Sequence, residues 1–164
     1  MKPYLITIWM ILVCSPFVSH AQITADNFNP AVKLIAGKYP ITVATDDLNG
    51  DGLKDIVVVN QGAGSISIFR NKDTPYVIAD SSFTTKNDIN IGTGSMPESL
   101  VLSDVDGDGK KDIVVSYYNS KVLSVLKNNT ANNSTTFSFA TKIDIPIGFY
   151  TQSISPDDID GDGK

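Results

Sequence analysis

Acidic side chains at regular spacing mark the part of this chain that could do chemistry. In the nine residues from Asp104 to Asp112, carboxylates stand at positions 1, 3, 5 and 9, and Gly109 stands at position 6. Two carboxylates about 4 Å apart repel each other by about 4 kcal/mol even at an effective dielectric constant of about 20, so a cation is expected among them. Because alternate residues of a tight loop can turn oxygen atoms onto one centre, and because the set holds no Cys or His, the spacing predicts a Ca²⁺ site.

The acidic loop occurs more than once. Residues 47–55 repeat it in full with an Asn at position 3, and residues 158–164 repeat its beginning. The predicted ligands are the side chains at positions 1, 3, 5 and 9 and the backbone carbonyl at position 7: Asp47, Asn49, Asp51, Leu53 and Asp55 in the first loop, Asp104, Asp106, Asp108, Lys110 and Asp112 in the second, and Asp158, Asp160 and Asp162 in the third. An EF-hand is excluded because its loop needs an acid at position 12 and a following helix. Position 12 is Val58 or Val115 here, inside an apolar, β-rich run.

The negative charge of the chain limits the classes of partner that it can bind. The formal net charge of -5 and the pI near 4.6 argue against binding to nucleic acids or acidic membranes. Ten of the 18 acidic residues lie in the three loops. The acidity therefore belongs mainly to the predicted metal sites.

Residues 1–21 are typical of a secretory signal peptide, with Lys2 before an apolar run and small residues at Ser19 and Ala21. We expect cleavage after Ala21 and export to the extracellular space or the cell surface. The apolar run is too short to span a bilayer, so no transmembrane segment is expected, and lipidation at Cys14 is the alternative. Cleavage would leave a chain without Cys or His, which excludes disulfides, zinc sites and Ser-His-Asp triads from that portion.

Similarity beyond the loops divides residues 22–164 into repeats of about 28–82 and 83–136 and a shorter one of 137–164. The first repeat holds four β-like runs, at Val32–Leu34, Ile41–Thr45, Asp55–Val59 and Ser65–Arg70. The third run is apolar without alternation, which is typical of a strand covered on both faces. Four short strands per repeat, with turn residues between them, predict an all-β fold of four-stranded antiparallel sheets, the blades of a β-propeller.

The two full repeats share a further pattern: an opening Phe28 or Phe83, Gly37-Lys38-Tyr39-Pro40 or Gly94-Ser95-Met96-Pro97, the acidic loop, Ile56-Val57-Val58 or Ile113-Val114-Val115, and a closing Asn71 or Asn128. This pattern resembles the FG-GAP/VCBS repeat of integrin-α-like β-propellers. The resemblance implies calcium bound between the second and third strands of a blade, and about two and a half blades of a ring of about seven. Such a piece is expected to fold poorly alone, because its open blade faces would stay apolar and wet. Asn49, a neutral ligand where the family has an acid, is expected to weaken the first site.

Two functions fit these expectations. We expect a secreted scaffold with structural calcium, which binds an extracellular protein or carbohydrate and is not an enzyme. The alternative is the propeller portion of a carbohydrate-active enzyme, such as a polysaccharide lyase, whose catalytic residues lie beyond this stretch. Fold alone does not choose between them. Tyr117 and Tyr118 could form a sugar-binding platform, although the strand pattern favours packing of one and exposure of the other.

Overall fold

The computed structural model describes residues 32–72, 79–84, 86–92 and 95–158. The expected cleavage site after Ala21 and the alternative lipid site at Cys14 lie outside these residues, as do Asp160 and Asp162 of the third loop. The described ranges hold one short 3₁₀ turn, η2 (Asp80–Ser82). Among them there is no helix with the length and apolar character needed to cross a membrane.

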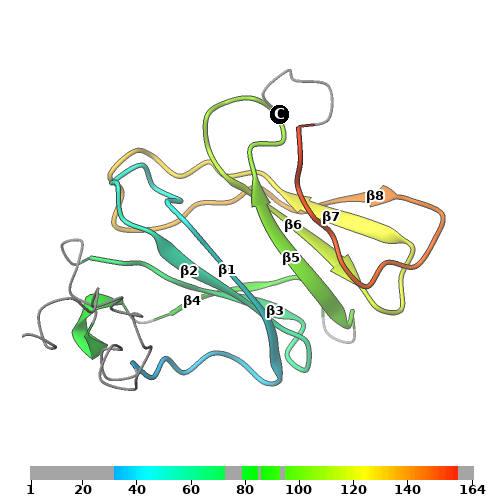
Figure 1. Ribbon diagram of the computed structural model, residues 1–164, viewed down its shortest axis with the longest axis horizontal. Coiled ribbons are helices and arrows are strands. Elements are labelled where there is room, and N and C mark those ends of the chain that lie inside the picture. Colours follow the sequence, from blue (N-terminus) through cyan, green and yellow to red (C-terminus); the bar gives the residue numbers. More distant parts are fainter. Residues whose placement is uncertain (1–31, 73–78, 85, 93–94, 159–164) are drawn as a thin grey trace, which may run out of the picture. The chain divides into compact units, whose positions relative to one another are not determined.

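The described residues form two antiparallel sheets of four strands each (Figure 1). The strands are β1 (Pro40–Asp46), β2 (Asp55–Asn60), β3 (Ser65–Phe69), β4 (Asn87–Asn90), β5 (Pro97–Ser103), β6 (Asp112–Tyr117), β7 (Val122–Leu126) and β8 (Ile143–Pro146). The first sheet has the order β1-β2-β3-β4 and the second the order β5-β6-β7-β8. The prediction of an all-β chain built from four-stranded antiparallel sheets is therefore confirmed.

The boundaries of each sheet differ by one strand from the boundaries of the sequence repeat. The outer strand of the first sheet, β4, comes from the run that opens the second repeat, and β8 likewise comes from the third repeat. The equivalent run of the first repeat, Val32–Leu34, which the pattern predicts as a strand, is not one. The equivalent runs β4 and β8 each pair with the third strand of the preceding sheet, and the described residues place no such strand beside Val32–Leu34. The predicted four strands per sheet are thus present, but neighbouring repeats share them.

The strand that follows each acidic loop is buried more completely on one face than on the other. In β2, Val57 and Val59 are fully buried, whereas Ile56 and Val58 are half-buried. In β6, every residue except Val114 is buried. The expectation that both faces are covered therefore holds for most of β6 and only in part for β2, because the described residues place a second sheet against one face of β2.

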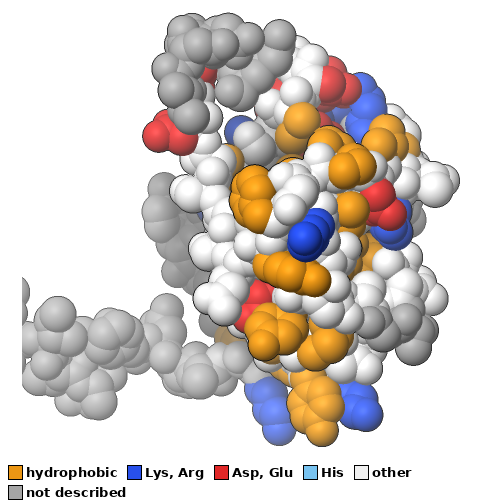
Figure 2. Space-filling view, turned by 90° about the vertical axis from the view of Figure 1, so that its right-hand side faces the viewer, with side chains coloured by type: hydrophobic (Ala, Val, Ile, Leu, Met, Phe, Trp, Pro, Cys, Tyr) orange, Lys and Arg blue, Asp and Glu red, His pale blue; other side chains and the backbone are white. Residues whose placement is uncertain are grey.

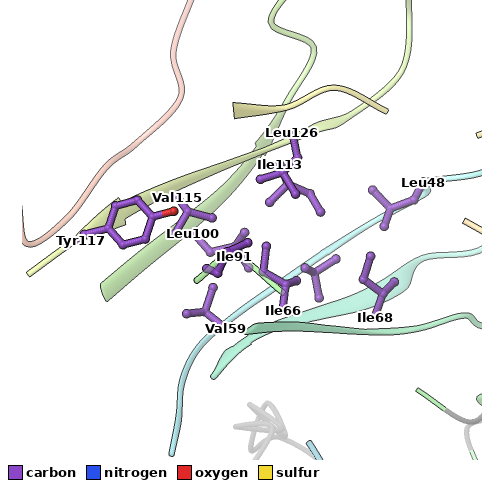
Figure 3. Packing of buried hydrophobic residues seen from close by; sticks show 11 residues of the cluster. Leu48, Val59, Ile66, Ile68, Ile91, Leu100, Ile113, Val115, Tyr117 and Leu126 are labelled. Atoms are coloured by element: carbon purple, nitrogen blue, oxygen red, sulfur yellow. The ribbon is translucent and has the colours of Figure 1, made fainter. Parts of the chain in front are cut away.

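The hydrophobic core lies between the two sheets (Figure 3). The first sheet contributes Val57, Val59, Ile66 and Ile68, and the second contributes Leu100, Ile113, Val115, Tyr117 and Leu126. Burying one such aliphatic side chain stabilises the fold by about 1.5–3 kcal/mol. The faces that meet are not equivalent in the repeat: Val57 belongs to the core, whereas Val114, at the same place in the second repeat, does not. Such head-to-tail packing is the kind that generates rings of repeats.

Candidate metal centre

Both complete acidic loops connect the first strand of a sheet to the second. Residues 47–54 join β1 to β2, and residues 104–111 join β5 to β6. Position 6 of each loop has positive φ, 84° at Gly52 and 86° at Gly109. A side chain would strain the backbone there, so glycine permits the sharp turn that the spacing requires.

The aspartate at position 1 organises each loop from inside. Asp104 Oδ1 accepts the backbone N–H groups of Gly107 at 2.8 Å and Asp108 at 3.1 Å, and its Oδ2 accepts that of Gly109 at 2.8 Å. Asp47 accepts the corresponding N–H groups of the first loop at distances between 2.7 and 3.2 Å. Protein hydrogen bonds therefore help to hold both loops in their turn.

The aspartate at position 9 is buried beneath its loop. Asp112 accepts the backbone N–H groups of Val105 at 3.1 Å and Asn128 at 2.8 Å. Asp55 makes the same two kinds of contact in the first loop, at 3.0 and 2.9 Å. Burial raises the pKa of Asp55 to about 6, against the lowering effect of these two hydrogen bonds. Both carboxylates tie the loop to the end of the third strand, a structural task that the spacing alone did not reveal.

Three carboxylates of the second loop converge on one point. One oxygen atom from each of Asp104, Asp106 and Asp108 lies within 4.8 Å of the others. The backbone N–H of Lys110, the position-7 residue, donates to Asp108 Oδ1 at 3.0 Å and fixes that side chain. The predicted ligands at positions 1, 3 and 5 are thus brought together, and Asp112 is not among the converging groups.

The ammonium group of Lys127 lies against this cluster. It forms ion pairs with Asp106 and with Asp108, the latter at 3.0 Å. The hydrogen bond from Lys127 holds the pKa of Asp108 below its ordinary value, and the bonds to Asp106 and Asp108 raise the pKa of Lys127. The repulsion between these carboxylates is therefore relieved in this structure by a cation of the protein itself.

The first loop is less exposed than the second, although Gly50, Gly52 and Lys54 remain exposed. Asn49 is 1% exposed, and its side-chain Nδ2 donates to Asp51 Oδ2 at 2.9 Å and to the carbonyl of Ser134 at 2.7 Å. The guanidinium of Arg70 lies 3.7 Å from Asp51 Oδ2, and the backbone N–H of Leu53 donates to Asp51 Oδ1 at 3.0 Å. Asn49 thus acts as a hydrogen-bond donor that joins the loop to the chain around Ser134, while its Oδ1 accepts from the backbone N–H of Asp51 at 3.4 Å.

The third loop is described only at its start. Asp158 is exposed, and Asp160 and Asp162 lie outside the described residues.

Two cationic residues that the sequence motif does not include contact the acidic loops, and the closing Asn of the motif has a role that its spacing did not show. Arg70 and Lys127 occupy the same place in the two repeats, just before the Asn that closes the pattern, and each reaches its own acidic loop. Asn128 is fully buried, and its Nδ2 donates to the carbonyls of Leu48 at 2.8 Å and Lys111 at 3.1 Å. It therefore joins the first loop to the second. A cation repeated beside a repeated acidic loop was the sequence signal that could have identified Arg70 and Lys127.

The donor set of the second loop fits a hard divalent cation. Its converging groups are all carboxylates, and oxygen ligands with no nitrogen or sulfur favour Ca²⁺ or Mg²⁺ over transition metals. A stand-in cation, Lys127, already lies against two of them. The first loop fits less well, because an amide nitrogen of Asn49 faces Asp51 there.

Comparison with known proteins gives one match. A family model described as FG-GAP-like repeat matches residues 47–115 and 104–164. The two matched segments overlap across the second acidic loop, so each begins with an acidic loop and runs into the next. No curated protein and no solved structure matches the chain.

Proposed function

The chain belongs to the FG-GAP-like repeat family, and on that premise we propose that it is a secreted, calcium-binding β-propeller repeat protein that serves as an extracellular binding scaffold. Repeats of this family suggest an extracellular-type propeller and often mediate protein binding. In this proposal calcium is structural, and the partner is an extracellular protein or carbohydrate. The scaffold role rests on the family, and the calcium role rests on the geometry of the second loop.

The observation that supports calcium binding is the convergence of Asp104, Asp106 and Asp108 within 4.8 Å. These three side chains would hold the ion, together with the backbone carbonyl of Lys110. An ion in this place takes over the charge neutralisation that Lys127 provides in its absence. An ion bound in the second loop would also hold the turn between β5 and β6, because its ligands come from alternate positions of that loop.

Calorimetric titration of chelator-treated protein with CaCl₂ tests this proposal. Extracellular calcium modules have dissociation constants of about 10⁻⁴ to 10⁻³ M, so about 1 mM calcium should stabilise each site by about 0.4–1.4 kcal/mol. We expect two sites, the tighter one in the second loop. The matched control is Asp106→Ala combined with Asp108→Ala, which should remove the tighter site only. Absence of heat together with an unchanged melting temperature would contradict calcium binding.

Export can be tested separately. Intact-mass analysis of protein collected from the culture medium should give a chain that begins at Gln22. A chain that begins at Cys14 and carries lipid mass would instead place the protein on a membrane surface. An uncleaved chain that still carries residues 1–21 and stays inside the cell would contradict secretion.

A further inference from the structure

A cavity of about 440 Å³ lies at the end of the second sheet opposite the acidic loop. It is lined by Tyr118 and Asn119 of the turn between β6 and β7, and by Tyr150 and Gln152 of the segment that follows β8. In Figure 1 these two segments lie at the lower right, and the loop that joins β5 to β6 lies at the top. The cavity has the size of sites that bind small ligands, about 300–1,000 Å³.

Two tyrosine rings give the cavity its chemical character. Tyr118 is 54% exposed and Tyr150 is 63% exposed, so both rings present a face to solvent. Lys121 Nζ lies 5.2 Å from the centre of the Tyr150 ring, a cation–π contact that orients the ring. Figure 2 shows hydrophobic side chains gathered along this side of the molecule, with Lys or Arg side chains beside them at the lower end. Tyr117 does not take part, because it is buried and its hydroxyl donates to Ser124 Oγ at 2.6 Å.

The junction between the two sheets provides an internal comparison. At the places that correspond to Tyr118 and Gln152, the first repeat has Gln61 and the second has Glu98. There the Nε2 of Gln61 donates to Glu98 Oε2 at 2.9 Å and bridges the junction with polar side chains. At the later junction a tyrosine and a glutamine replace this pair, and the space between them forms the cavity. The later junction therefore has an aromatic surface flanked by amide groups where the earlier junction has a hydrogen-bonded pair of polar side chains.

Aromatic faces next to amide side chains match one ligand class. The axial C–H groups of a pyranose ring pack on a tyrosine face, and its hydroxyl groups exchange hydrogen bonds with Asn and Gln amides, which both donate and accept. None of the four lining residues carries a formal charge, so the lining itself matches a neutral sugar, and the Lys121 ammonium that contacts the Tyr150 ring is not among the lining groups. Pockets of this composition, apolar with a few convergent polar groups, are typical of small-ligand sites.

We propose that the cavity lined by Tyr118, Asn119, Tyr150 and Gln152 binds a pyranose unit of a neutral oligosaccharide. The two rings supply the stacking surface and the two amides select the hydroxyl pattern. This proposal deepens the scaffold function and rests on it for the general role, while the site itself needs no metal ion.

The test is binding of neutral pyranose oligosaccharides to the full chain, first on a glycan array and then in solution with cellohexaose, maltohexaose, mannohexaose and xylohexaose. We expect at least one of them to shift the amide signals of Tyr118 and Tyr150 in NMR spectra. Tyr118→Ala or Tyr150→Ala should weaken that binding about tenfold or more, because the stacking surface is lost. Tyr118→Phe and Tyr150→Phe, which keep the ring, should retain most of it.

Two further variants keep the test decisive. Tyr39→Ala is the matched control: Tyr39 is 66% exposed and lies under a lysine as Tyr150 does, but its ring packs so closely on Gly62 that a Cβ there would lie 2.3 Å from it. Its replacement should leave binding unchanged. Tyr118→Gln combined with Gln152→Glu installs the bridge of the earlier junction and should abolish binding while the melting temperature stays the same.

Binding to no neutral pyranose, or equal losses in the Tyr39 and Tyr150 variants, would overturn the proposal. The titrations are run both with calcium and with chelator. Sugar binding that survives in chelator while calorimetry detects no calcium binding would reject the calcium role and keep this site. Calcium binding without sugar binding would reject this site alone.

Discussion

The two complete acidic loops follow one template and have different surroundings. The loop at 104–111 is largely exposed, and Lys127 forms ion pairs with two of its three converging carboxylates. The loop at 47–54 is covered by the chain around Ser134, which Asn49 contacts through both its side chain and its backbone carbonyl. Figure 1 shows this later segment passing beside the first loop. A motif therefore encodes a turn and a set of oxygens, while the neighbouring repeat determines how exposed those oxygens are and which protein groups contact them.

The largest effect is expected where the two loops are joined. Asn128→Ala removes a fully buried amide that donates to the carbonyls of Leu48 and Lys111. Leaving buried carbonyls without a donor should lower the free energy of unfolding by about 2–4 kcal/mol. The equivalent Asn71→Ala should lower it less, because Asn71 is 8% exposed whereas Asn128 is fully buried.

Urea unfolding of the two variants measures this difference, with the exposed neighbour Asn129→Ala as control. Equal losses at Asn71 and Asn128 would show that the link between the loops adds nothing to stability.

The next prediction distinguishes a residue that would bind the metal ion from a residue that holds its loop in place. Asp108→Ala should weaken calcium binding at the second loop by about tenfold or more, because affinity follows the number of charged ligands. Asn49→Ala should change calcium affinity at the first loop less and should instead lower the melting temperature, since its amide bonds to Asp51 and Ser134 are lost. Calorimetry and thermal unfolding read the two quantities in parallel, and equal losses of affinity in the two variants would count against this assignment.

A smaller effect is expected from the built-in cations. Lys127→Met should raise the calcium affinity of the second loop by about threefold, because the ion no longer competes with an ammonium group for Asp106 and Asp108. In chelator the same variant should melt at a lower temperature, since the carboxylates lose their counter-charge. Arg70→Met should change calcium affinity less, because Arg70 contacts one carboxylate at 3.7 Å. A fall in calcium affinity on removal of Lys127 would contradict the competition.

The smallest effect is a difference in pH response between the loops. The raised pKa of Asp55, about 6 from an ordinary 3.8, means that the metal-free folded chain binds this proton more tightly than the unfolded chain. Its contribution to stability is therefore fully present below about pH 3.8 and is lost as the pH rises through about 6. Asp108 behaves in the opposite way: its lowered pKa stabilises the fold above its ordinary value, and that contribution is lost as the pH falls below it.

Carboxyl-carbon NMR titration in chelator measures both midpoints. We expect Asp55 to titrate near pH 6 and Asp108 below its ordinary range. A midpoint for Asp55 at or below that of Asp108 would contradict the difference in burial between the two loops.

Much of the fold could be predicted from the chain because its signals are local. Alternation in Ser65–Arg70 and the apolar run after each loop predicted strands that the structure confirms, the first of them as Ser65–Phe69. The run at Val32–Leu34 carries the same local signal and is not a strand, because a strand forms only where a partner supplies hydrogen bonds. The repeat period could not show that β4 and β8 complete the sheets of the preceding repeats.

The candidate site likewise has features that depend on local sequence and features that depend on tertiary packing. The sequence by itself determined the turn, its glycine and the oxygens of Asp104, Asp106 and Asp108, because these depend on positions a few residues apart. Only the tertiary structure decided that Lys127 pairs with two of them, that Asn128 bonds to Leu48, 80 residues earlier in the chain, and that Tyr118 and Tyr150 line one cavity. Each of these depends on how strands distant in sequence pack against one another, which no local spacing encodes.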